Sequence, residues 1–169
     1  NCGNSSTCVQ VLTKVDTTPP TNSCPQPTTI ECDQATDPTV TGEPFAFDNC
    51  DPDLDITYED NIENTDGCTT VLRRIWSAED NCGNVSTCEQ FITITDSTPP
   101  TLDCPENVTV ECDQATDPTA TGEPTVSDNC DMDLDISYSD NTSQISDCEQ
   151  IIERNWTVSD DCDNTVSCF

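Results

Sequence analysis

The cysteines of this chain repeat with a fixed offset, and this period constrains the fold more than any other feature. Cys24 is followed by Cys104 and Cys50 by Cys130, an offset of 80 in both cases, and the other cysteines keep the same offset. The segment ECDQATDPT at 31–39 returns unchanged at 111–119. A fixed period is the signature of tandem structural repeats, in which each repeat is one supersecondary unit. We therefore expect units of this length arranged in series.

The TPPT segments at 18–21 and 98–101 are expected to be linkers, because prolines fix the backbone and cannot continue a central strand. With the unit boundaries placed at these linkers, the chain has one complete repeat over 21–98 and a second repeat over 101–169 that lacks its last strand. Residues 1–18 match only the end of a unit, so they are predicted to be the terminal part of a preceding repeat. Two interpretations stay open: a window cut from a longer array, or a subunit whose N-terminal strand completes its neighbour by strand donation.

The cysteine content indicates a disulfide scaffold. The chain has 14 cysteines in 169 residues, no Cys-x-x-Cys pair and no histidine, so the usual zinc-binding spacings are missing. Disulfides persist in oxidising compartments, and an extracellular or cell-surface location is therefore predicted.

The charge excludes several classes of function. With 34 acidic and 4 basic residues the formal net charge is −30, which would repel nucleic acid and anionic membrane surfaces. No apolar run approaches the length that a membrane span needs, so membrane insertion is not expected. Without histidine, neither Ser-His-Asp nor Cys-His catalysis is available, and the chain is not expected to be an enzyme.

One alternating segment indicates the core. Residues 70–78 read TVLRRIWSA, which alternates as a half-buried strand does, and the second unit retains only one of the two faces. The retained positions are Leu72, Arg74, Trp76 and Ala78 in the first unit and Ile152, Arg154, Trp156 and Val158 in the second. Each inward arginine is expected to form an ion pair with a carboxylate and to stack on an aromatic ring.

These features predict an all-β fold of tandem immunoglobulin-like antiparallel β-sandwich repeats, since short strands, a unit of this length and one tryptophan per unit are typical of that class. A unit of this size buries limited apolar area, and disulfides are expected to supply the remaining stability.

The segment CPENVTVEC, the Asp-Asn-Cys loop, the tryptophan strand and DNCGNVSTCEQFITITD together resemble hyalin-type (HYR-type) repeats. The resemblance covers essentially the whole chain. It implies immunoglobulin-like modules in long secreted bacterial surface proteins. It therefore implies a structural unit of an extracellular filament or stalk, with neighbouring repeats or identical subunits as partners. An adhesin module that binds glycan or protein is the alternative; it would need a loop that differs between units and carries exposed aromatic residues. An accessory module of a secreted hydrolase is a third interpretation.

The disulfide pairing is not fixed by spacing, because six cysteines allow 15 connectivities. The pattern of the resembled family suggests Cys24–Cys88, the two Asp-Asn-Cys loops suggest Cys50–Cys82, and Cys32–Cys68 would remain. The same set in the second unit is Cys104–Cys168, Cys130–Cys162 and Cys112–Cys148.

The acidic loops are candidate calcium sites. DNCDPDLD at 48–55 recurs as DNCDMDLD at 128–135, and carboxylates this close repel one another unless a cation lies between them. Calcium prefers six to eight oxygen ligands, but this loop is not an EF-hand, because Ile56 and Ile62 occupy the positions that require Gly and Glu. The predicted loop ligands are Asp48, Asn49, Asp51, Asp53 and Asp80, with Asp128, Asn129, Asp131, Asp133 and Asp160 in the second unit. A separate linker site is predicted at Asp16 and Asp96, and the alternative for all these residues is a solvated acidic surface.

Five Asn-x-Ser/Thr sequons are possible glycosylation sites: Asn4, Asn84, Asn107, Asn141 and Asn155.

Overall fold

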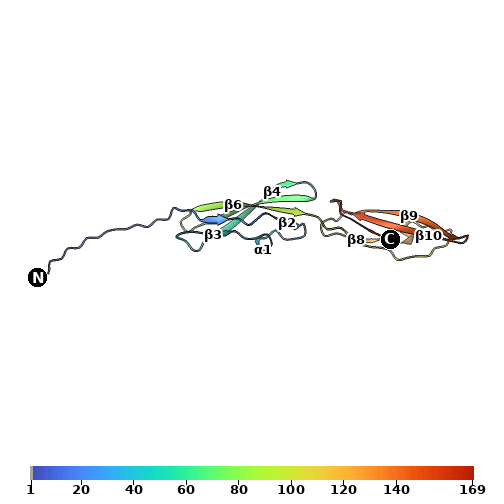
Figure 1. The fold of residues 1–169 in the computed structure, drawn as a ribbon, viewed down its shortest axis with the longest axis horizontal. Coiled ribbons are helices and arrows are strands. Elements are labelled where there is room, and N and C mark those ends of the chain that lie inside the picture. Colours follow the sequence, from blue (N-terminus) through green and yellow to red (C-terminus); the bar gives the residue numbers. More distant parts are fainter. Residues whose placement is uncertain (1) are drawn as a thin grey trace.

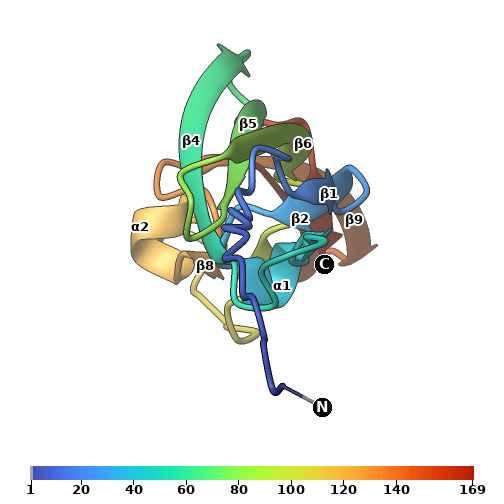
Figure 2. The same cartoon turned by 90° about the vertical axis from the view of Figure 1, so that its left-hand side faces the viewer.

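The structure, a computed structural model, describes residues 2–169. It is elongated: two groups of strands follow one another along the long axis (Figure 1). Residues 2–20 form neither helix nor strand, and they lead away from the first group as an extended tail. Viewed along the long axis, the two groups lie one behind the other (Figure 2).

The first group contains six strands and one short helix. Its elements are β1 (Thr21–Ser23), β2 (Thr28–Glu31), α1 (Pro38–Thr41), β3 (Phe45–Phe47), β4 (Asp55–Thr65), β5 (Thr69–Glu79) and β6 (Val85–Thr95). Strands β1 and β3 form a two-stranded antiparallel sheet, and the other strands form a sheet in the order β2-β6-β5-β4. The expected antiparallel pairing is found for β1 with β3, β4 with β5 and β5 with β6, whereas β2 pairs with β6 in parallel, which was not expected. Because β2, near the start of the unit, runs in the same direction as the last strand, β6, the chain enters at one end of the unit and leaves at the other.

The second group repeats this arrangement at the offset of the sequence repeat. Its elements are β7 (Thr101–Asp103), α2 (Pro118–Thr121), β8 (Thr125–Ser127), β9 (Asp135–Ser146), β10 (Glu149–Ser159) and β11 (Thr165–Cys168). Strands β7 and β8 form one sheet, and β11-β10-β9 form the other. The two helices begin alike, because Asp37 and Asp117 each accept a hydrogen bond from the backbone N–H two residues later. Neither helix is long and apolar enough to cross a membrane.

The two groups differ at one edge. In the first, β2 lies beside residues 92–95 of β6, and Ile30 is only 6% exposed. The counterparts of residues 92–95 in the second unit would lie after Phe169, and residues 108–111 form no strand. Val110, the counterpart of Ile30, is therefore 38% exposed.

Each core is built around a tryptophan and a buried arginine. Trp76 is 3% exposed and Arg74 is fully buried. The Arg74 guanidinium donates to both carboxylate oxygens of Asp60 (2.7 and 2.8 Å) and lies 4.3 Å from the centre of the Tyr58 ring. Arg154 makes the same contacts with Asp140 and Tyr138, although 13% of its side chain is exposed. The expected ion pair and aromatic contact are confirmed in both units.

Four disulfides form, and only two of them lie within a unit. Cys24–Cys88 and Cys104–Cys168, the bonds that the family resemblance suggests, each join a residue next to the small sheet to a strand of the large sheet. The other two, Cys32–Cys130 and Cys68–Cys162, join the first unit to the second.

The other four predicted disulfides are not present in the structure. Cys32–Cys68 and Cys130–Cys162 do not form, because each of these cysteines has a closer partner in the adjacent unit. Cys50–Cys82 and Cys112–Cys148 do not form either, and these four cysteines are exposed thiols.

Candidate functional site

The candidate functional site is the junction between the two units, which we call the joint. It comprises Cys32, Cys68, Cys130, Cys162 and the linker residues 96–100. Cys32 follows β2 and Cys68 lies in the turn between β4 and β5. Both are tied to the end of β6: the N–H of Cys32 donates to the Thr95 carbonyl (3.0 Å), and the N–H of Asp96 donates to the Cys68 carbonyl (3.3 Å). These hydrogen bonds hold Cys32 and Cys68 at the end of the first unit where the linker to the second unit begins.

Cys130 and Cys162 lie in the two Asp-Asn-Cys and Asp-Asp-Cys loops of the second unit. The sequence led us to expect a disulfide between these loops, but a hydrogen bond joins them instead: the Asp131 carboxylate accepts from the backbone N–H of Asp161 (2.9 Å). The first unit has the same bond, from Asn81 to Asp51 (2.7 Å). The loops are therefore side by side, as expected, while their cysteines remain available to another unit.

The linker is fixed to both units. The N–H and hydroxyl of Ser97 donate to the Glu31 carboxylate of the first unit. On the other side, the side-chain amide of Asn164 donates to the backbone carbonyl of Asp96 (3.5 Å). Pro100 is buried. The connection is therefore held by the first unit, the second unit and the two disulfides.

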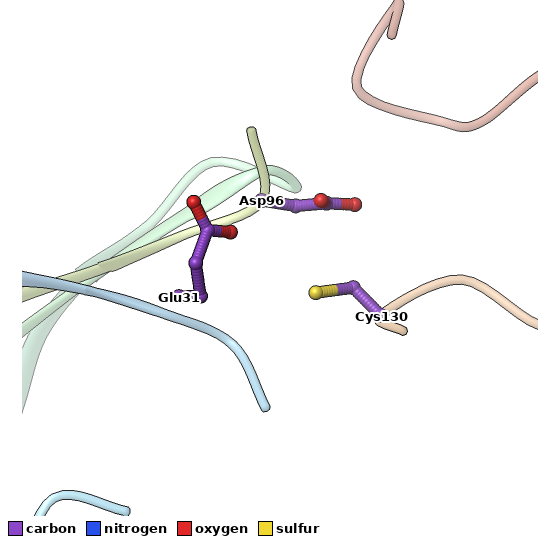
Figure 3. Close-up of side chains that lie close together, drawn as sticks. All are labelled: Glu31, Asp96 and Cys130. Carbon is purple, nitrogen blue, oxygen red and sulfur yellow. The ribbon is translucent and has the colours of Figure 1, made fainter. Parts of the chain in front are cut away.

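Carboxylates gather at the joint. Oxygen or sulfur atoms of Glu31, Asp96 and Cys130 lie within 4.8 Å of one another, and Figure 3 shows the two acidic side chains beside the Cys130 sulfur. Asp96 also lies within this distance of Asp160 and Cys162. A cavity of about 210 Å³ opens here.

A related cluster lies at the other end of the first unit, where carboxylate oxygens of Asp16, Asp48 and Asp80 lie within 4.8 Å of one another. Adding 80 to these numbers gives Asp96, Asp128 and Asp160. The sequence predicted a loop site and a separate linker site, but the structure brings both to one place. Linker carboxylates pack against the loops of the following unit, because the short linker leaves them no other position.

The electrostatics of this cluster favour a bound cation. Desolvation raises the pKa of Asp96, and the negative charges of neighbouring carboxylates, with Asp128 first among them, raise it further. The Oδ2 atoms of Asp48 and Asp128 are buried and have no hydrogen-bond partner among the described residues. Oxygen atoms left without a donor, in a group of repelling carboxylates, fit a calcium ion.

Other predicted ligands lie elsewhere. Both carboxylate oxygens of Asp51 accept backbone N–H groups, and Asp131 does the same, which lowers the pKa of Asp131. The amide groups of Asn49 and Asn129 face the sulfurs of the adjacent cysteines. Asp53 and Asp133 are exposed and lie outside the clusters. Glu31 was not predicted to belong to the site; its place in the repeated ECDQ segment was the only signal.

Two further surface features bear on function. The rings of Phe45 and Phe47 are tilted by 42° to each other, with centroids 6.2 Å apart. They are 71% and 54% exposed, and the second unit has Thr125 and Ser127 in their places. The amide of the sequon residue Asn84 donates to Asp80 (2.8 Å). The other sequon asparagines, Asn4, Asn107, Asn141 and Asn155, are exposed.

In the comparison with known proteins, no protein-family model and no curated protein matches the chain. The four disulfides indicate a compartment outside the reducing cytoplasm.

Proposed function

We propose that this chain is a structural element of an extracellular filament or surface stalk, built from hyalin-like, immunoglobulin-like repeats. The observation that carries the proposal is the pair of disulfides that crosses the joint, Cys32–Cys130 and Cys68–Cys162. These bonds fix the direction of one unit relative to the next, and a stalk must keep its direction over many units.

The mechanism is geometric. A single covalent connection between two bodies lets them rotate in any direction, and two connections still allow a hinge about the line that joins them. The linker and the two disulfides make three connections at separate points, which removes the hinge as well. Each bond also closes a loop of 98 or 94 residues, and such a loop is expected to stabilise the folded state by about 4–5 kcal/mol in the chain-entropy account.

Removing the joint disulfides should release the second unit from the first. In the variant with Ser at Cys32, Cys68, Cys130 and Cys162, we expect each unit to tumble faster and the range of end-to-end distances to broaden. Backbone ¹⁵N relaxation and small-angle X-ray scattering measure these two quantities. The matched control carries Ser at the four exposed thiols Cys50, Cys82, Cys112 and Cys148, and its two units should tumble as they do in the monomeric parent protein. Equal tumbling of variant and control would count against a rigid stalk.

We further propose that calcium binds the two carboxylate clusters, Asp16, Asp48 and Asp80, and Asp96, Asp128 and Asp160. In the first set the three carboxylates lie within 4.8 Å of one another; in the second, Asp96 lies within that distance of Asp160, and the charge of Asp128 raises the pKa of Asp96. A divalent cation at this place would replace repulsion across the joint by attraction. Its contribution would add to the rigidity that the disulfides provide.

Calcium should raise the melting temperature of the non-reduced protein, followed by the fluorescence of Trp76 and Trp156. A ligand that binds only the folded state stabilises it by about 2.7 kcal/mol at one hundred times its dissociation constant. The double variant Asp48→Asn, Asp128→Asn should lose this shift, because it removes the two unpartnered oxygens. The control, Asp53→Asn with Asp133→Asn, changes the net charge equally and should keep it. A shift that survives in the first variant, or that sodium chloride reproduces, would indicate a general charge effect.

An adhesive role is the second candidate, and one observation favours it. Phe45 and Phe47 form an exposed aromatic pair that is present in only one of the two units. Loss of surface attachment on replacing them with the residues of the second unit, Thr and Ser, would support this role.

A further inference from the structure

We infer that the exposed thiols at the two ends of this structure are the open halves of further joints of the same kind. Cys112 and Cys148 at one end are then the partners of Cys50 and Cys82 of a second copy of this repeat pair, which docks head to tail. The inference deepens the proposed function by naming the partner and the bonds that join it.

The positions of the thiols carry the first step. The joint pairs Cys32 with Cys130 and Cys68 with Cys162. Adding 80 to Cys32 and Cys68 gives Cys112 and Cys148, while subtracting 80 from Cys130 and Cys162 gives Cys50 and Cys82. All four of these residues are exposed free thiols. Each end therefore carries one half of the joint, and the two halves are complementary rather than alike.

The surface around Cys50 and Cys82 is already shaped like its bonded counterpart. The Asp48 carboxylate accepts from the N–H groups of Cys50 (2.8 Å) and Asp51 (3.1 Å), as Asp128 does for Cys130 and Asp131. The Asp80 carboxylate holds the N–H of Cys82 (2.9 Å), as Asp160 holds that of Cys162. A second copy would meet a preformed loop pair and would need little rearrangement of the backbone.

Burial at the bonded joint shows what docking does to these loops. Cys130 and Cys162 are half-buried in the joint, whereas their counterparts Cys50 and Cys82 are exposed. Cys68 is likewise half-buried and Cys148 exposed, whereas Cys32 and its counterpart Cys112 are both exposed. The exposed cysteine loops at the two ends are therefore the same surfaces that the structure shows in contact at the joint.

The contact is heterologous, because one end of the chain meets the opposite end of the next. Such contacts do not close on themselves unless the rotation forms a ring, and they produce open linear assemblies. The covalent step is balanced by a disulfide oxidant such as oxidised glutathione. Two thiols lose two protons and two electrons to form the protein disulfide, and the oxidant is released as two molecules of reduced glutathione.

The test uses two variants, both with Cys2 and Cys8 replaced by Ser so that the tail thiols do not compete. The first variant carries Cys50→Ser and Cys82→Ser, and the second carries Cys112→Ser and Cys148→Ser. Each retains the four disulfides of the structure and only one half of a joint. In glutathione redox buffer we expect each variant alone to stay a monomer on a non-reducing gel. The mixture should form a dimer, and the chain that keeps all four thiols should form a ladder.

Peptide mapping of the dimer decides the proposal. The expected cross-links are Cys112 to Cys50 and Cys148 to Cys82, and their presence would support it. Dimers of either variant alone, a crossed set such as Cys112 to Cys82, or monomers throughout would overturn it. None of these outcomes changes the tumbling of the two units within one chain, so failure here is distinguishable from failure of the rigid stalk.

Discussion

The oxidised protein pulled from its two ends should lengthen very little, and full reduction should make it extensible. The Cys24–Cys88 and Cys104–Cys168 bonds each bypass 64 residues, so a load passes from Cys24 to Cys88, along β6 and the linker to Cys104, and on to Cys168. Only 104 − 88 = 16 residues of that path are backbone, which span at most about 55 Å when extended. With all bonds reduced, the path from Cys24 to Cys168 has 168 − 24 = 144 residues and can reach about 490 Å.

Single-molecule force spectroscopy before and after adding a reductant measures this difference. The oxidised chain should show no unfolding step much longer than the short load path, and steps of the longer scale should appear only after reduction. The variant with Ser at Cys50, Cys82, Cys112 and Cys148 is the control, and it should match a single, uncross-linked molecule of the oxidised parent. Long steps in the oxidised parent would show that the load does not follow these bonds.

Arg74→Ala should destabilise the first unit by about 1–3 kcal/mol, because it removes a buried guanidinium from a pair whose carboxylate, Asp60, is 27% exposed, and it leaves buried acceptors without a donor. The guanidinium also donates to the Thr41 hydroxyl (2.8 Å) and the Thr36 carbonyl (2.6 Å), so the change leaves these two oxygens without their donor. Arg74→Lys should recover only part of the loss, since an ammonium group cannot make the two-pronged contact with Asp60. Denaturant unfolding followed by tryptophan fluorescence measures the effect.

The adjacent residue provides the control. Arg73 pairs with Glu63 and Glu89 on the surface, with 32% of its side chain exposed, and Arg73→Ala should cost about 0–1 kcal/mol. Arg154→Ala should fall between the two, because its side chain is less buried than that of Arg74. Equal losses at positions 73 and 74 would mean that the buried contacts do not stabilise the unit.

Local sequence predicted the parts of the structure that depend on neighbours along the chain. Alternation identified Arg74, Trp76 and Ala78 as one buried face, because side chains alternate along any strand. The fixed offset between the cysteines predicted that the strands of the first unit would recur in the second. The parallel pairing of β2 with β6 was missed, because the direction in which distant strands pair leaves no local pattern.

The sequence by itself determined the repeat, the β-strands, the tryptophan and arginine core and the acidic loops beside the cysteines. Only the tertiary structure decided which sulfurs meet and which carboxylates share a site. Cys32 and Cys130 have a sequence separation of 98, the repeat of 80 plus an offset of 18 within the unit, and spacing alone does not favour that sum over Cys32–Cys68. Which cysteines pair depends on the end of the folded unit at which each loop lies. Because the chain enters a unit at one end and leaves it at the other, loops at facing ends of successive units lie close together. Asp16 and Asp96 lie beside loop carboxylates for the same reason, so residues of the predicted loop and linker sites lie together at both ends of the first unit.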